Sequence, residues 1–217
     1  MYFKYGEKEL NYLKKKDKKL ATVIDKVGVV ERKLEPDIFV CIVKNIVGQQ
    51  ISTKAHQTIW QRINNSFSPI TPANFKSLSA EELQKCGITM KKAHYIKEIT
   101  RRIISDQLDL ERLADLSNEE VIEQLCELPG IGRWTAEMIL TFSLQRKDII
   151  SYSDLAILRG MRMVYHHRRI TPQLFTKYKR RYGPYATIAS LYLWAVAAGA
   201  IPELKDYAPK SKNNVRI

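Results

Sequence analysis

Residues 127–136 read Glu127-Leu128-Pro129-Gly130-Ile131-Gly132-Arg133-Trp134-Thr135-Ala136, and the fold that we expect is built around this segment. Two glycines, separated by one residue, allow a tight turn and leave backbone N–H groups uncovered. A helix is expected on each side, so those N–H groups lie at a helix N-terminus, which favours an anion such as a DNA phosphate. A plain turn between packed helices is the simpler alternative, but LPGxG between two helices is more specific than GxG alone.

Most of the remaining chain has the periodicity of helices. Residues 35–47 and 91–104 place apolar side chains at i, i+3 and i+4, and residues 184–199 are apolar almost all round, which predicts a central helix. Short β-branched runs at 22–24 and 28–30 lack a hairpin turn between them, so strand formation is weakly indicated. Capping residues predict further helix starts at Ser52, Ser79, Ser117, Thr71-Pro72 and Thr171-Pro172.

These patterns predict an all-α protein of about ten helices in two lobes, with a polar tail at residues 208–217. The formal net charge of +13 favours a polyanionic partner, either nucleic acid or an anionic membrane surface. No apolar run reaches the roughly 20 residues of a membrane-spanning helix, and the N-terminus lacks the apolar core of a signal peptide. We therefore expect a soluble, intracellular monomer in the cytoplasm or nucleoid, or in the nucleus of a eukaryote.

The cysteines do not indicate a metal centre. Cys41, Cys86 and Cys126 form no CxxC pair, which argues against a zinc site and against an iron–sulfur cluster. Each cysteine lies among apolar residues, so we interpret all three as packed thiols. His166 and His167 are adjacent on an expected helix and point in different directions, which does not suit a metal either.

Four segments, in this order along the chain, together resemble the helix-hairpin-helix DNA glycosylase superfamily. The hairpin LPGIGRWTA is similar to that of the DNA-3-methyladenine glycosylase II, or alkylpurine glycosylase, group. The other three are a GQ-containing loop, a G-x-x-x-K-[KR]-A segment, and an Asp about twenty residues after the hairpin. In this chain they are Ile46–Ser52, Gly87–Ala93 and Ser151–Ala156.

The resemblance covers about residues 36–199 and implies a two-lobed helical domain with an active cleft between the lobes. By this analogy one lobe comprises about 1–34 and 118–217, the other about 35–117, and the hairpin spans 128–132. The implied activity is base excision: hydrolysis of the N-glycosidic bond of an alkylated purine, such as 3-methyladenine or 7-methylguanine, after the base is flipped out of double-stranded DNA.

The resemblance also implies roles for individual residues. Asp154 is the expected catalytic carboxylate, although a carboxylate in the first turn of a helix has a structural use as well. Trp134, Trp194 and Met138 are expected to line the base pocket, with core packing as the alternative for the two tryptophans. Trp134 stands where bifunctional relatives carry a Schiff-base lysine, which implies hydrolysis without strand cleavage.

DNA contacts are expected from the hairpin and from the GQ-containing loop. A side chain of residues 48–51 should fill the gap left by the flipped base, and Gln50 is the candidate. No cofactor is implied, except a structural Na⁺ or K⁺ held by the backbone carbonyls of Cys126, Leu128 and Ile131. Ten basic residues among 146–181 predict a phosphate-binding rim. The full set of expected DNA-binding residues is Gly130, Ile131, Gly132, Arg133, Gln49, Gln50 and Ile51.

Two rival functions stay open at this point. The first is a non-catalytic helix-hairpin-helix module that recognises DNA structure, which would need neither Asp154 nor the aromatic pair. The second is a bifunctional glycosylase/lyase of the endonuclease III type, which the absence of a Lys at 134 and of a Cys cluster opposes.

Overall fold

The computed structural model describes residues 1–209, and these residues form twelve α-helices and one 3₁₀ helix, η1 (Arg112–Ala114). Pairing of extended backbone within them is limited to an isolated antiparallel bridge between Tyr2 and Lys33. The all-α prediction is therefore confirmed, and the run at 22–24 is helical. No helix in this part of the chain is long and apolar enough to cross a membrane. Residues 210–217 of the predicted polar tail lie outside the described residues.

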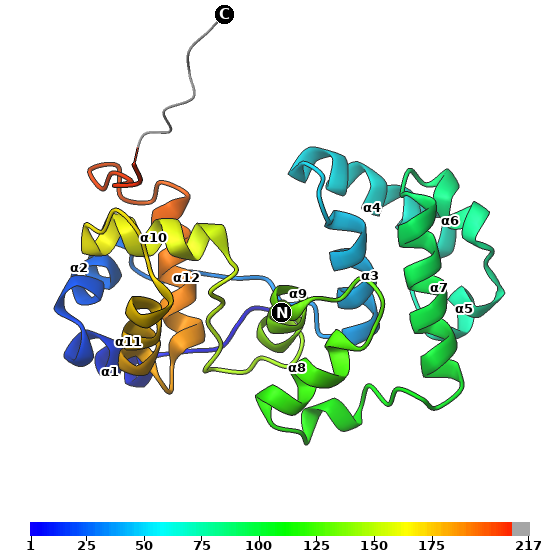
Figure 1. Cartoon of the computed structure of the whole chain (residues 1–217), viewed down its shortest axis with the longest axis horizontal. Coiled ribbons are helices and arrows are strands. Elements are labelled where there is room, and N and C mark those ends of the chain that lie inside the picture. The colour runs from blue at the N-terminus through cyan, green and yellow to red at the C-terminus, as the bar shows by residue number, and fades with distance from the viewer. Residues whose placement is uncertain (210–217) are drawn as a thin grey trace, which may run out of the picture. The chain divides into compact units, whose positions relative to one another are not determined.

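The chain folds into two compact units. The hairpin unit contains Met1 and residues 34–145, and the terminal unit contains residues 2–33 together with the described residues from Arg146 on. Figure 1 shows α1 and α2, from the start of the chain, in the same unit as α10, α11 and α12 from its end.

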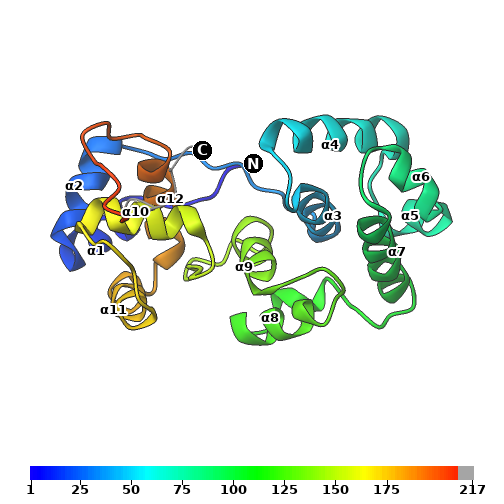
Figure 2. The ribbon, with the colours of Figure 1, turned by 45° about the horizontal axis from the view of Figure 1, so that its top comes forward.

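In the hairpin unit, α3 (Ile38–Gly48) packs against α4 (Thr53–Phe67), α7 (Met90–Ile104) and α9 (Arg133–Phe142) (Figure 2). Its apolar side chains, among them Phe39, Ile42 and Ile46, are almost fully buried. Three further helices complete the unit: α5 (Pro72–Ser77), α6 (Ala80–Lys85) and α8 (Asn118–Cys126).

The terminal unit is built around α12 (Ala186–Ala197). This helix packs against α1 (Glu7–Lys16), α2 (Lys18–Val27), α10 (Leu155–Tyr165) and α11 (Pro172–Tyr182). Because α12 has neighbours on several sides, its side chains are apolar almost all round and ten of its twelve residues are buried. The central position predicted for residues 184–199 is confirmed.

The unit boundary lies after Gln145 and differs from the expected division, which placed residues 118–145 with the C-terminal helices. Hydrogen bonds explain the difference. The Glu35 N–H donates to the Phe142 carbonyl at 3.0 Å, and the Ser143 hydroxyl donates to the Glu35 carbonyl at 2.6 Å. These bonds tie α9, and with it α8, to the segment that enters α3.

Candidate functional site

The hairpin turn depends on Gly130. Its φ of +79° lies in the region that favours glycine, and a Cβ atom there would be 2.3 Å from Cδ2 of Tyr95. The Ile131 N–H donates to the Leu128 carbonyl at 3.1 Å, which closes the turn. The Ile131 side chain is buried, so the residue stabilises the turn both by packing and by its N–H hydrogen bond.

Gly132 has a different environment. It is the N-cap of α9 with an ordinary φ of −100°, and apart from its chain neighbours no atom of the described residues lies within 4 Å of the position that a Cβ would take. It provides no side-chain cap to the first N–H groups of α9. The start of α9 therefore has the features of an anion-binding helix N-terminus. Of the two glycines, only Gly130 is required by the backbone.

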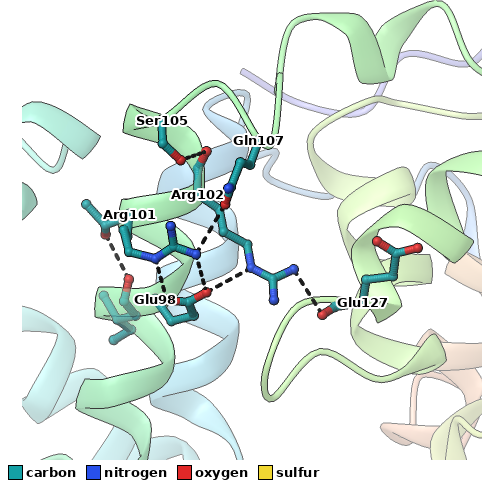
Figure 3. A network of polar contacts seen from close by, with 8 residues as sticks. Glu98, Arg101, Arg102, Ser105, Gln107 and Glu127 are labelled. Atoms are coloured by element: carbon teal, nitrogen blue, oxygen red, sulfur yellow. Dashed lines mark hydrogen bonds and ion pairs between the residues drawn. The ribbon is translucent and has the colours of Figure 1, made fainter.

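Arg133 and Arg102 brace the hairpin through polar contacts. Arg133 donates to both carboxylate oxygens of Glu119, at 2.8 and 3.1 Å, and to Glu137 at 3.2 Å. Arg102 of α7 contacts Glu98 and donates to the Glu127 carbonyl at 3.3 Å (Figure 3). Sequence reasoning gave Arg133 a DNA contact; in the structure its guanidinium joins α8 to α9, and the DNA contact stays a prediction.

The 48–51 loop joins α3 to α4 and is fastened to the hairpin. The Gln49 side chain donates from Nε2 to the Gly130 carbonyl at 2.7 Å. Gln50, the next residue, is exposed and has a φ of +55°, a left-handed conformation that non-glycine residues rarely adopt. Ile51 is 36% exposed. Of the three loop residues predicted to contact DNA, Gln49 therefore uses its side chain inside the protein, whereas Gln50 and Ile51 reach solvent.

Asp154 lies in the terminal unit as the N-cap of α10. Its Oδ1 accepts hydrogen bonds from the N–H groups of Ala156 and Ile157, both at 2.9 Å, and the residue is only 7% exposed. These bonds fix the carboxylate in one orientation at the N-terminus of α10.

Helix α12 supports the segment that leads to Asp154. The Ile149 N–H donates to the Thr187 hydroxyl at 2.9 Å, and the Ser190 hydroxyl donates to the Ile149 carbonyl at 3.2 Å. Further along, α10 crosses α12 at Gly160, where a Cβ would be 2.3 Å from the Leu193 carbonyl oxygen. The Asp154 carboxylate is therefore held on a rigid, packed pair of helices.

The expected pocket residues divide between the two units. Trp134 is 39% exposed, and Met138, one helical turn later in α9, is only 4% exposed. Trp194 belongs to α12 in the unit that carries Asp154, is partly exposed, and has the Arg32 guanidinium 5.6 Å from its ring centroid. A single base pocket formed by all three side chains stays a prediction, as does the active cleft.

Four of the ten basic residues in the predicted rim contact carboxylates within residues 1–209. Lys147 contacts Glu9 at 2.7 Å, Arg162 contacts Asp206 at 2.7 Å, and Arg181 contacts Asp17 at 2.7 Å. Arg159 also approaches Asp206, at 3.8 Å. Five exposed residues remain as the main candidates for phosphate contacts: Arg168, Arg169, Lys177, Lys179 and Arg180.

Sequence reasoning missed two features beside Asp154. Leu155, the first residue of α10, is 81% exposed, although its helix is otherwise well packed. Ser151 is fully buried, and its hydroxyl is one of two buried side-chain groups without a hydrogen-bond partner among the described residues. Neither feature is visible in the sequence, because exposure and pairing depend on the tertiary neighbours.

Comparison with known proteins places this arrangement in a family. Residues 43–184 match the model of the HhH-GPD superfamily base excision DNA repair proteins, and this range includes the hairpin, the 48–51 loop and Asp154. The chain belongs to the HhH-GPD superfamily. The predicted family relationship is therefore confirmed.

Relatives of this HhH-GPD chain cover most of its length. DNA-3-methyladenine glycosylase 1 of Schizosaccharomyces pombe is 33% identical over 76% of the chain and 73% of that relative. The structure is similar to a DNA-3-methyladenine glycosidase from Bacillus halodurans, with a TM-score of 0.84, 31% identity, and 95% and 97% of the two chains covered. It is also similar to the S. pombe 3-methyladenine DNA glycosylase in complex with abasic DNA, with a TM-score of 0.79, 29% identity, and 88% and 97% coverage.

Proposed function

We propose that this HhH-GPD protein is a DNA glycosylase that hydrolyses the N-glycosidic bond of alkylated purines in double-stranded DNA and leaves the strand intact. The observation that carries the proposal is the Asp154 carboxylate, which two helix N–H groups hold in place at the N-terminus of α10. A protein that only bound DNA structure could use this carboxylate as a helix cap alone, but its place about twenty residues after the hairpin, where the family pattern has an Asp, favours a catalytic role.

DNA binding begins at the hairpin in this proposal. The N-terminus of α9, where Gly132 is the N-cap residue, binds a backbone phosphate, and further phosphates contact Arg168, Arg169, Lys177, Lys179 and Arg180. The damaged nucleotide then rotates out of the stack, because its glycosidic bond is inaccessible in a duplex. Gln50 fills the space that the base leaves and can form hydrogen bonds to the orphaned partner base.

Asp154 acts on the sugar. As the glycosidic bond breaks, positive charge builds up on the deoxyribose, and a fixed carboxylate stabilises that charge and orients the attacking water. Since the orientation of the carboxylate is set before the reaction, little reorganisation is needed at the transition state.

The expected substrate follows from a mechanism that uses one carboxylate and no general acid. A purine methylated at N3 or N7 carries a formal positive charge, so it leaves as a neutral molecule and needs no general acid. An indole face attracts such a cation by roughly 0.5–2 kcal/mol. The Arg32 guanidinium already lies over the Trp194 ring, 5.6 Å from its centroid, so a cationic base must use the other face of the indole or displace this side chain. We therefore propose 3-methyladenine and 7-methylguanine as substrates, with weaker activity on hypoxanthine.

A monovalent cation at the hairpin is compatible with the turn. The carbonyls of Cys126, Leu128 and Ile131 are the proposed ligands, and carbonyl oxygens suit hard cations. The Leu128 carbonyl accepts one hydrogen bond, from the Ile131 N–H at 3.1 Å, which leaves its second lone pair for an ion. The cation would supply positive charge beside the bound phosphate.

We expect base removal without strand cleavage, because the Trp134 indole cannot form an imine with the sugar. The test uses a duplex with a single 7-methylguanine. Strand breaks should appear only after alkali treatment, which cleaves abasic sites, and borohydride added during the reaction should trap no protein–DNA adduct. A trapped adduct would show that a lysine attacks the sugar, and intact DNA after alkali would contradict the glycosylase proposal itself.

A further inference from the structure

Lys92 contacts the end of α3. It lies near the start of α7, in the G-x-x-x-K-[KR]-A segment for which the sequence offers no role. Its Nζ donates to the Val47 carbonyl at 3.0 Å and to the Gln49 carbonyl at 2.6 Å. The last carbonyls of a helix have no partner inside the helix and favour a cation. Lys92 therefore acts as a C-terminal cap for α3 and fixes the backbone where the 48–51 loop begins.

The same loop residue connects Lys92 to the hairpin. While the Gln49 carbonyl accepts from Lys92, the Gln49 side chain donates to the Gly130 carbonyl at 2.7 Å. One turn beyond Lys92, the Tyr95 ring lies against Gly130, so closely that a Cβ on this glycine would be 2.3 Å from Cδ2 of the ring. The N-terminal half of α7 therefore positions both the loop and the hairpin.

The conformation of Gln50 requires such support. A φ of +55° in a non-glycine residue is unfavourable and persists where the surroundings hold it. Gln49 is anchored immediately before it. Immediately after Ile51, the Ser52 hydroxyl accepts from the Ala55 N–H at 3.2 Å and starts α4. The exposed Gln50 and Ile51 are thus held between two fixed points.

We propose that Lys92 is a positioning residue for base flipping: by holding the Val47 and Gln49 carbonyls, it presets Gln50 in the conformation that enters the duplex. The proposal rests on the proposed function, because it assigns the inserting side chain to Gln50. Without Lys92, the loop must be ordered at the moment of insertion, so base extrusion slows while chemistry at Asp154 does not. Lys92 itself contacts neither the base nor the sugar.

Lys97 provides a matched control on the same helix. Its Nζ also donates to two backbone carbonyls, those of Phe75 at 2.8 Å and Lys76 at 2.9 Å, but these belong to α5. Burial lowers the pKa of both lysines. Replacing either lysine by Met therefore removes the same kind of contact, and only the Lys92 variant affects the 48–51 loop.

We expect Lys92→Met to slow excision from a fully paired duplex about tenfold, the value of a charged hydrogen-bond contact, with less than about twofold loss on the same lesion in a single strand. Gln50→Ala should show the same selective loss, because extrusion costs less when the base is unpaired. Lys97→Met should change both rates equally or not at all, and Lys92→Arg should restore much of the duplex rate.

A second measurement does not depend on excision. A duplex with a tetrahydrofuran abasic analogue opposite 2-aminopurine reports insertion, because an inserting side chain disturbs the stacked, fluorescent base. Lys92→Met should reduce the fluorescence change as much as Gln50→Ala does. If the Lys92→Met variant does not fold, Lys92→Gln is used in its place. Wild-type-like fluorescence in the Lys92 variants, or an equal effect of Lys97→Met, would overturn the proposal. A normal fluorescence change without any excision by the wild type would contradict the proposed function alone.

Discussion

Asp154→Asn is expected to lower the single-turnover excision rate at least about a hundredfold, the usual effect of removing one electrostatic stabiliser from an active site. Asn is a good N-cap, so the hydrogen bonds to the N–H groups of Ala156 and Ile157 are preserved and the fold should be as stable as before. What is lost is the negative charge that stabilises the sugar cation. The measurement is excision of 7-methylguanine from a duplex with enzyme in excess.

A matched control exists in the hairpin unit. Asp37 is the N-cap of α3 and accepts from the Val40 N–H at 2.9 Å, the same structural use of a carboxylate. Asp37→Asn should leave the excision rate unchanged, and Asp154→Asn should still bind abasic-site DNA. Near-wild-type turnover by Asp154→Asn would show that Asp154 acts only as a helix cap.

Gly130→Ala is expected to weaken binding to every duplex, damaged or not, about tenfold or more, because loss of a charged hydrogen bond to phosphate has about this effect. The added methyl meets the Tyr95 ring, and the φ of +79° strains any residue with a side chain. The turn that presents the start of α9 must therefore distort. Binding to undamaged duplex at several salt concentrations measures the effect, and the slope against salt should fall as a phosphate contact is lost.

Gly132→Ala separates the turn from the phosphate contact. Since Gly132 has an ordinary φ and open space at its Cβ position, this variant should be as stable as the wild type. Any weaker binding by Gly132→Ala then reports obstruction of the phosphate. If a folded Gly130→Ala variant bound DNA as well as the wild type, the hairpin would have only a structural role.

The sequence predicts those features that short-range hydrogen bonding controls. Ser52, Ser79 and Ser117 begin helices as predicted, since each hydroxyl accepts from an N–H three residues later. Asp154 could be located in the same way, because an N-cap is recognisable from its neighbours and its distance from the hairpin is a family pattern. The apolar side chains all round residues 184–199 likewise predicted the central position of α12.

Features that depend on distant residues could not be predicted. The Gln49 contact with Gly130 joins residues 81 positions apart, and it gives this side chain a partner inside the protein, while its DNA contact stays a prediction. Arg133 pairs with Glu119, and the division after Gln145 follows from bonds between Glu35 and Phe142. The role of Lys92 has the same origin: its motif was recognised, but the carbonyls that it binds belong to a helix 43 to 45 residues earlier.

A panel of single-lesion duplexes tests whether this HhH-GPD protein removes cationic alkylated purines, as we propose. The panel contains 3-methyladenine, 7-methylguanine, hypoxanthine, uracil and 8-oxoguanine, each in the same sequence, with the wild-type enzyme in excess. We expect the fastest single-turnover excision for 3-methyladenine, comparable or slower excision for 7-methylguanine, and slower excision for hypoxanthine. Faster removal of uracil or 8-oxoguanine than of 3-methyladenine would contradict it.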